Sequence, residues 1–125
     1  MTTLDTPTDS LSMPRFVGVP SFMRLPMCND STGLDVAILG LPSDSGAPFR
    51  TGARMGPNAV RAASIMLRPI NPYRGNIDIF KALKIADVGD APVVPGYEIE
   101  TLNWLETALD RVVTTGAVPC CIGGD

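Results

Sequence analysis

The sequence predicts an α/β protein built around a parallel sheet, and three observations carry that prediction. Three short apolar runs have the composition of buried strands, and turn-forming residues follow them. Apolar residues recur at helical spacing in the two segments between these runs. The order strand, helix, strand, helix, strand is typical of a parallel sheet with right-handed crossovers, and the predicted strands are residues 34–41, 83–88 and 118–122.

The first 33 residues differ in composition from the rest of the chain. They are rich in Thr, Ser, Pro and Asp, and their one apolar patch, at residues 16–27, is short. We therefore expect residues 1–33 to form an extended arm that lies on a body made by residues 34–125, rather than an element of the core.

The first predicted strand leads through a loop into the first predicted helix. The run LDVAILGL, at 34–41, is continuously apolar and partly β-branched, which favours a strand buried on both faces. After the turn-forming PSDSG, a helix is expected to begin at Gly56-Pro57, because a proline suits the first helical turn, where its missing N–H would have no partner. The residues expected on one face of this helix are Val60, Ala63, Ser64 and Leu67.

The segment 98–113 is the clearest helix in the sequence. Two glutamates lie in its first turn and an arginine near its last, as the helix dipole favours, and Gly116 stands where a C-terminal cap belongs. Its apolar residues fall on one face, which we expect to be buried against the sheet: Leu102, Leu105, Leu109, Val112 and Val113.

Glycine and an acid follow each predicted strand. The three sequences are Ser43-Asp44-Ser45-Gly46, Gly89-Asp90 and Gly123-Gly124-Asp125. Ligands of parallel sheets bind beyond the carboxyl ends of the strands, and glycine lets backbone approach closely there. We therefore expect the functional site at this edge of the sheet.

The residues alone leave three kinds of site open at that edge. A nucleotide-binding half-domain is disfavoured, because the first strand-to-helix loop is too long and lacks the G-x-G-x-x-G fingerprint. A non-catalytic domain kept for assembly or regulation agrees with the absence of histidine from the sequence. A cation site made by Asp44, Asp90 and Asp125 would suit Mg²⁺ or Mn²⁺, although an acid after a strand is more often a turn residue or a helix N-cap.

Composition excludes several other classes. The net charge of −3 and the lack of a basic stripe disfavour nucleic-acid binding, and no apolar stretch is long enough to span a membrane. The amino terminus has two acids and no base before Arg15, unlike a secretory or transit peptide. Three cysteines, two of them adjacent, indicate buried thiols in a reducing compartment, so a cytoplasmic location is expected.

Several stretches at fixed spacing resemble the arginase and agmatinase family, the ureohydrolases. The sequence GLPSDSGAPFRTGARMGPNAVRAAS, at 40–64, is similar to the loop and helix that follow the family's first strand. The arm PRFVGVPSFMRLP, at 14–26, and IADVGDAPV, at 85–93, are similar to the branch of agmatinase, guanidinobutyrase and guanidinopropionase. The resemblance implies the amino-terminal part of a three-layer α/β/α fold with a parallel sheet, truncated after the third strand.

The end of the chain, IGGD at 122–125, is similar to the start of the family's first metal signature. In the family, the next residue is a histidine that binds one of two Mn²⁺ ions, and the other ligands come from later strand ends. The resemblance therefore places Gly123, Gly124 and Asp125 beside an expected metal ligand, while this chain itself supplies no catalytic residue and no metal ligand.

The resemblance also implies a reaction, the hydrolysis of a guanidino compound to urea and an amine by a metal-activated hydroxide. The whole enzyme is expected to be a homo-oligomer, and the isolated chain to be inactive. The sequence does not choose among agmatine, guanidinobutyrate and guanidinopropionate. The candidates for shaping the substrate site are Asp44, Ser45, Arg50 and Arg54, although the two arginines are more simply explained as contacts that hold the loop in place.

Overall fold

A three-stranded parallel sheet forms the centre of the molecule, which a computed structural model describes for residues 7–124. Strand β1 (Val36–Leu41) lies between β4 (Ile85–Asp90) and β5 (Val118–Gly123). Val36 pairs with Ile85 on one side and with Val118 on the other. The predicted parallel α/β fold is confirmed, and the first predicted strand lies in the interior of the sheet, as expected.

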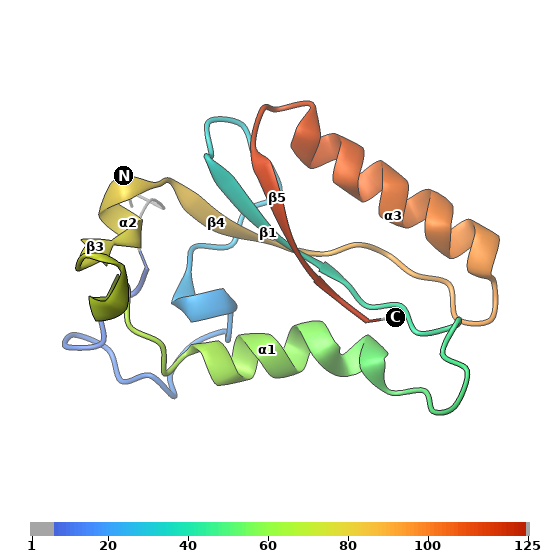
Figure 1. Cartoon of the computed structure of the whole chain (residues 1–125), viewed down its shortest axis with the longest axis horizontal. Helices are drawn as coiled ribbons and strands as arrows, with labels where there is room; N and C mark the ends of the chain where they lie inside the picture. Colours follow the sequence, from blue (N-terminus) through green and yellow to red (C-terminus); the bar gives the residue numbers. More distant parts are fainter. Residues whose placement is uncertain (1–6, 125) are drawn as a thin grey trace.

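Helices cover both faces of this sheet (Figure 1). Helix α3 (Glu98–Val113) packs on one face, where Ala37 and Leu39 of β1 meet Val112. Helix α1 (Gly56–Ser64) and the short helix α2 (Ile79–Ala82) lie on the other side, and there Ile38 packs with Leu25 and Ile85. Successive residues of β1 thus point to opposite layers, which explains why its sequence is continuously apolar.

The buried face of α1 is not the one that the apolar spacing predicts. Its buried residues are Pro57, Arg61 and Ser64. Val60, Ala63 and Leu67 are exposed. The predicted helix is present but ends at Ser64, so Leu67 lies beyond it. The helix is held through polar contacts of Arg61 and Ser64 rather than through an apolar stripe.

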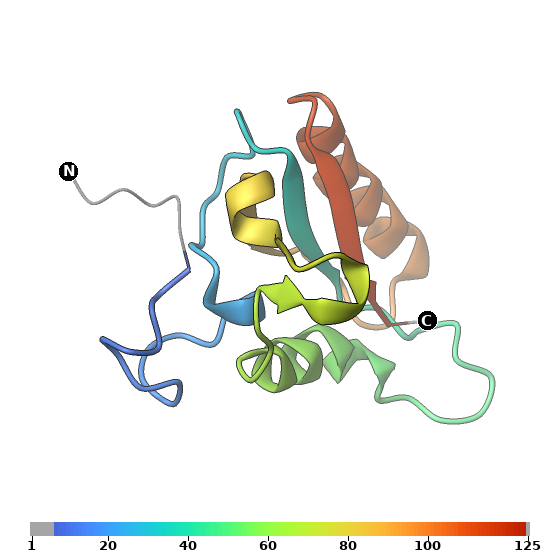
Figure 2. The same cartoon turned by 60° about the vertical axis from the view of Figure 1, so that its left-hand side comes forward.

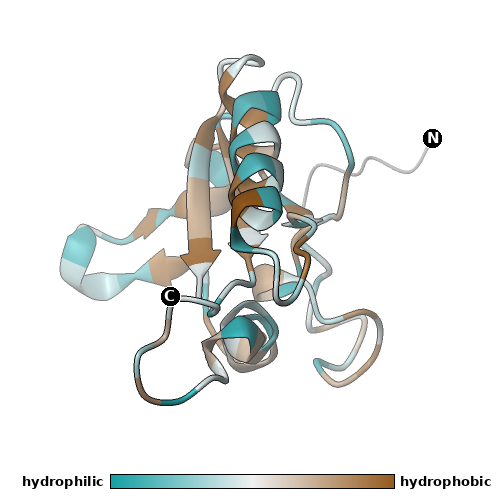
Figure 3. Ribbon diagram, turned by 90° about the vertical axis from the view of Figure 1, so that its right-hand side faces the viewer, coloured by the Kyte–Doolittle hydropathy of each residue, from teal (hydrophilic) through white to brown (hydrophobic). Residues whose placement is uncertain are grey.

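Helix α3 has the predicted bounds, and Gly116 adopts the left-handed conformation (φ 86°) that a C-terminal cap needs. Its predicted apolar face is only partly buried. Val112 is buried and Leu105 and Leu109 are half-buried, whereas Leu102 and Val113 are exposed. Figure 3 shows this mixture of polar and hydrophobic residues along α3, beside strands that are mostly hydrophobic. Three strands are too narrow a surface to cover the whole face of a sixteen-residue helix.

The described part of the arm, from residue 7, lies against the body. Its short helix η1 (Phe22–Arg24) leads to Met27, which forms a parallel bridge with Asp87 at the free edge of β4. Leu25 is 3% exposed and belongs to the core, which the composition of this segment did not indicate. The proposed domain boundary after residue 33 remains a prediction.

Residues 70–82 form structure that the sequence pattern did not predict. A hairpin of two short strands, β2 (Ile70–Asn71) and β3 (Ile77–Asp78), leads into α2. Figure 2 shows this unit in front of the sheet. Elements this short contain no hydrophobic period, so only their turn residues could have indicated them. The short helices η2 (Ala53–Met55) and η3 (Pro72–Arg74) complete the described elements. Across the described residues, no helix is both long enough and apolar enough to cross a membrane.

Candidate functional site

The loop after β1 is organised by a buried carboxylate, Asp44. This residue is 1% exposed, and its Oδ2 accepts hydrogen bonds from the backbone N–H groups of Gly52 (2.6 Å) and Arg54 (3.1 Å). Its Oδ1 accepts a hydrogen bond from Arg54 Nε at 2.6 Å. A single side chain therefore joins the two ends of the loop between β1 and α1.

These contacts keep Asp44 ionised. The hydrogen bond from the backbone of Gly52 is the main cause that lowers the pKa of Asp44 below its usual value, and those from Arg54 act in the same direction. Burial opposes them, because it disfavours the charged form. The carboxylate is thus the stable form of Asp44 in the folded protein near neutral pH.

The other predicted residues of this loop differ in their contacts. Arg54 forms an ion pair with Asp44, with 41% of its side chain exposed, which agrees with a role in holding the loop in place. Arg50 is exposed and lies over the ring of Phe49, 5.1 Å from the ring centre. Ser45 is also exposed. Ser45 and Arg50 are thus the two of these residues whose side chains make no hydrogen bond to the loop and are exposed at this edge.

Two glycines bring the end of β5 against the same loop. The N–H of Gly124 donates to the carbonyl oxygen of Leu41 at 3.1 Å, and a Cβ on Gly124 would overlap with the carbonyl group of Ser43. A Cβ on Gly56, at the start of α1, would lie 2.8 Å from the carbonyl oxygen of Gly123. Glycine is needed here because loop, helix and strand meet backbone to backbone. Asp125 lies outside the described residues.

Strand β4 carries an ion network that the sequence pattern did not indicate, buried at Asp87 and Arg61 and exposed at Asp90. Arg61 of α1 donates from Nε and Nη2 to the two carboxylate oxygens of Asp87, at 2.8 and 2.9 Å. Its Nη1 donates to Asp90 Oδ1 at 2.5 Å, and Nη2 also donates to the carbonyl oxygen of Gly89. Asp87 further accepts hydrogen bonds from the N–H groups of Phe22 and Gly89. The signal in the sequence was an acid inside the apolar run IADV.

The charges of this network stabilise one another. Burial alone would raise the pKa of Asp87, but the hydrogen bonds from Arg61, Phe22 and Gly89 bring it below its usual value. The hydrogen bond to Asp87 is the main cause that raises the pKa of Arg61. Because both groups are fully charged, Arg61 and Asp87 fix the arm, α1 and β4 relative to one another.

Two of the three acids considered for a cation site are therefore already paired with arginines. Asp44 bonds Arg54, and Asp90 bonds Arg61. Within residues 7–124, no three His, Cys, Asp or Glu side chains gather closely enough to hold a metal ion. The described residues alone do not fit a metal ion.

A hollow of about 380 Å³ lies where these strand ends meet helix α3. Residues from β1, its loop, the first half of α3 and the end of β5 line it, namely Leu41, Ser43, Gly46, Glu98, Thr101, Leu102, Leu105, Gly123 and Gly124. The predicted convergence of strand ends 41–46 and 123–124 is thus present in the structure. Asp90, which pairs with Arg61, does not line this hollow.

A match to a known protein family identifies the family of this chain. Residues 34–125 match the model of the arginase family. This chain belongs to the arginase family. The match covers the whole body of the molecule, from the residues before β1 to the last residue of the sequence.

Two curated relatives of this arginase-family chain are named guanidinopropionase and agmatinase. The chain is 38% identical to guanidinopropionase of Pseudomonas aeruginosa over 119 residues, which cover 95% of the chain and 37% of that enzyme. It is 40% identical to a mitochondrial agmatinase of Gallus gallus over 89% of the chain and 32% of that protein. The chain thus spans about a third of the length of these relatives.

Solved structures show the same fold. A hypothetical agmatinase from Burkholderia thailandensis superposes with a TM-score of 0.87 at 32% identity, covering 100% of this chain and 38% of that one. Proclavaminate amidino hydrolase from Streptomyces clavuligerus gives a TM-score of 0.80 at 31% identity, covering 90% of this chain and 37% of that protein. The arginase-like fold predicted from the resemblance is confirmed.

Proposed function

We propose that this chain is the amino-terminal part of an amidinohydrolase that hydrolyses a guanidino compound to urea and an amine. The observation that carries the proposal is the 38% identity to a guanidinopropionase along 95% of the chain. The relative named proclavaminate amidinohydrolase, 33% identical over 94% of the chain, supports the same reaction type. The isolated 125-residue chain is inactive in this proposal.

Manganese, two ions per site, is the proposed cofactor of the complete enzyme. We infer this from the similarity of IGGD, at 122–125, to the start of the family's first metal signature. Residues 7–124 alone do not fit a metal ion. No catalytic step is therefore assigned to this chain. Its contribution is to shape the site: Asp44 and Arg54 set the first loop, and the glycines of β5 seat the end of the strand against that loop.

The exposed residues of the first loop are the proposed contacts to substrate. Ser45 offers a hydroxyl group, and Arg50 a cation that attracts a substrate carboxylate and repels an amine. The proposed partners are a small guanidino compound and further copies of the complete chain, with no nucleic acid and no membrane. A cytoplasmic location is part of the proposal, although some relatives are named as mitochondrial enzymes.

A chimera tests the proposal directly. The corresponding segment of Pseudomonas aeruginosa guanidinopropionase is replaced by this chain, and urea release with Mn²⁺ is measured on guanidinopropionate, guanidinobutyrate and agmatine. We expect the chimera to release urea from at least one of them and the isolated chain to release none. A matched chimera with Gly124→Val should lose activity, because this side chain cannot fit against Ser43.

An assembly or regulatory domain derived from the same family is the alternative function. The observation that favours it is the absence of histidine from the sequence, together with the lack of a metal-ligand group in residues 7–124. In that case the folded chimera would bind Mn²⁺ but release no urea from any guanidino compound. Urea release by the chimera would rule this alternative out.

A further inference from the structure

Arg24, in the arm, is a buried cation with an incomplete set of hydrogen-bond partners. The residue is 8% exposed, and its Nη1 donates to the carbonyl oxygen of Met13 at 3.0 Å. Its Nη2 is buried and has no partner among the described residues, and no described carboxylate pairs with Arg24. A buried donor of a charged group without an acceptor is costly, so such a group usually marks an absent ligand or ion.

The backbone around Arg24 is fixed in an unusual conformation. Met23 and Arg24 have φ values of 50° and 59°, in the left-handed region that residues other than glycine rarely adopt. The N–H of Met23 donates to Ser64 Oγ of α1 at 2.7 Å, and Ser21 Oγ donates to the carbonyl oxygen of Leu25 at 2.6 Å. Strained backbone that is held by such contacts is characteristic of binding sites.

Arg24 lines a pocket of about 680 Å³ between the arm, the end of α1 and α2. Two more cations, Arg15 and Lys81, share the pocket with Asp9 and Asp78, so the lining carries one net positive charge. Both acids already have hydrogen-bond partners, because Asp9 accepts from the N–H of Leu11 and Asp78 from that of Phe80. Asp78 also pairs with Lys81 at 3.8 Å. Arg15 and Arg24 are thus the lining cations without a carboxylate partner among the described residues, and Arg24 is the buried one of the two.

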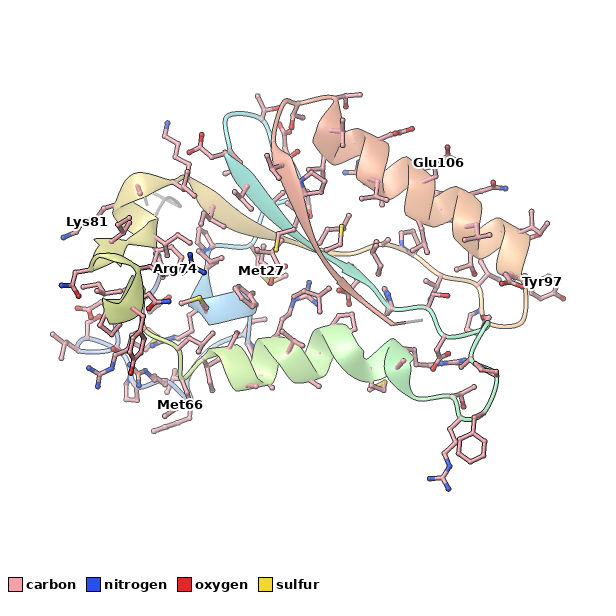
Figure 4. The ribbon with its side chains drawn as sticks, viewed as in Figure 1. Met27, Met66, Arg74, Lys81, Tyr97 and Glu106 are labelled. Carbon is pink, nitrogen blue, oxygen red and sulfur yellow. The ribbon has the colours of Figure 1, made fainter. Side chains whose placement is uncertain are left out.

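The other walls of this pocket are apolar. Ile65, Leu67 and Phe80 contribute to them, and a loop of the arm covers Arg24 through two contacts, from Thr8 N–H to the carbonyl of Arg24 and from Arg24 Nη1 to Met13. Because Nη2 is buried, a ligand in the pocket can reach it only if this loop shifts. Lys81 of this lining lies at the α2 end of the molecule, opposite to the strand-end loops (Figure 4). The pocket shares no lining residue with the hollow at the strand ends, so it is separate from the proposed substrate site.

We propose that this pocket binds a small organic monocarboxylate with a short apolar body. The carboxylate accepts a hydrogen bond from Arg24 Nη2, whose planar guanidinium matches it in shape, and the apolar body lies along Leu67 and Phe80. A dianion such as phosphate is less suited, because Asp9 and Asp78 lie in the same lining. This proposal does not depend on the proposed hydrolase activity.

Calorimetric titration of the 125-residue chain with sodium butyrate, at constant ionic strength, tests the proposal. We expect saturable binding, at least tenfold weaker binding of the neutral isostere butyramide, and weaker binding of inorganic phosphate. Absence of saturable butyrate binding to the folded chain would overturn the proposal. Equal affinity for butyramide would show that no carboxylate is recognised, and tighter binding of phosphate would contradict a monocarboxylate site.

Charge variants of one exposed wall residue locate the site without disturbing the fold. Leu67 is 55% exposed, so both Leu67→Glu and Leu67→Lys should fold. We expect Leu67→Glu to weaken butyrate binding at least tenfold and Leu67→Lys not to weaken it. Arg24→Gln should abolish binding, whereas Arg74→Gln, at the same end of the molecule but outside the pocket lining, should leave it unchanged (Figure 4). Equal affinities of the two Leu67 variants would overturn the assignment.

Discussion

Two buried aspartates hold together the segments that converge on the sheet. Asp44 joins the ends of the first loop, and Asp87 joins the arm and α1 to β4. Each carboxylate accepts two backbone N–H groups as well as hydrogen bonds from one arginine. Because the two aspartates hold different segments, substitutions at each should affect different parts of the molecule.

Loss of the Asp87 carboxylate should be among the most destabilising single changes in this chain. Asp87→Asn leaves the buried Arg61 without its bidentate partner, and breaking a buried pair on one side typically costs about 3–5 kcal/mol. Urea denaturation measures the loss of unfolding free energy. The matched control is Asp110→Asn at an exposed position, where we expect a change within about 0.5 kcal/mol. Equal effects of the two variants would mean that the network contributes nothing.

The same pair predicts how stability depends on pH. The pKa of Asp87 is lower in the folded protein than the value of about 3.9 for a free aspartate. Its stabilising contribution is therefore complete above about pH 4 and is lost as pH falls through the folded-state pKa. We expect the difference in unfolding free energy between the native chain and Asp87→Asn to be constant from pH 7 to 5. Below pH 4 this difference should shrink, and a difference that grew on acidification would contradict the assigned direction.

Asp44 should control the local order of the first loop. In Asp44→Ala, the amides of Gly52 and Arg54 lose their acceptor, so we expect their hydrogen exchange to accelerate at least tenfold. Ser45→Ala, next to it, changes an exposed side chain and serves as the control. Unchanged exchange at Gly52 in Asp44→Ala would show that the loop is ordered by other contacts.

At the scale of elements, a helix can be amphipathic in sequence without burying its whole apolar face. Of the predicted face of α3, only Val112 is fully buried, where it packs with Ala37 and Leu39 of β1. Leu102, near the other end of the helix, is 57% exposed and lines the hollow at the strand ends. Burial along α3 thus follows the extent of the sheet beneath it.

This difference predicts unequal effects of alanine substitutions along α3. Val112→Ala should lower the unfolding free energy by about 2 kcal/mol, because it removes two buried methyl groups and leaves a cavity. Leu102→Ala removes a larger side chain, yet we expect a change within about 0.5 kcal/mol at this exposed position. Denaturant titrations of both variants provide the comparison. A larger loss for Leu102→Ala would show that its face of α3 is covered in solution.

At the scale of the whole molecule, the two outer strands differ in what lies beyond them. The free edge of β4 is bridged by Met27 of the arm, whereas β5 pairs with β1 alone among the described strands. An open strand edge is a site for further pairing. The chain also covers only 37% of the guanidinopropionase that it matches, so residues beyond this match supply most of that enzyme's fold.

Hydrogen exchange of the guanidinopropionase chimera should reveal pairing at this edge. In the isolated chain we expect slow exchange along β1, which has partners on both sides, and faster exchange at the β5 amides that do not face β1. In the chimera these β5 amides should slow at least tenfold, because a further strand pairs with them. The β1 amides serve as the internal reference. Unchanged exchange along β5 would contradict completion of the sheet at this edge.

The sequence by itself determined the local elements and the family. The continuously apolar composition of the strands and the helical spacing of apolar residues in α3 located β1, β4, β5 and α3 to within two residues at either end. The glycines after β1 and at the end of β5 indicated where the first loop and β5 meet. The motifs of residues 40–64 identified the family, which the match to residues 34–125 confirms.

Only the tertiary structure decided which side chains are buried and what they bond. Arg61 lies on the buried face of α1 because it bonds Asp87 of β4, 26 residues later in the sequence, whereas a helical pattern predicts such an arginine to be exposed. Arg24 is likewise enclosed by segments distant in sequence, including Ile65 and Phe80. These contacts depend on the packing of separate elements, and hydrophobic periodicity within one element contains no information about its partner.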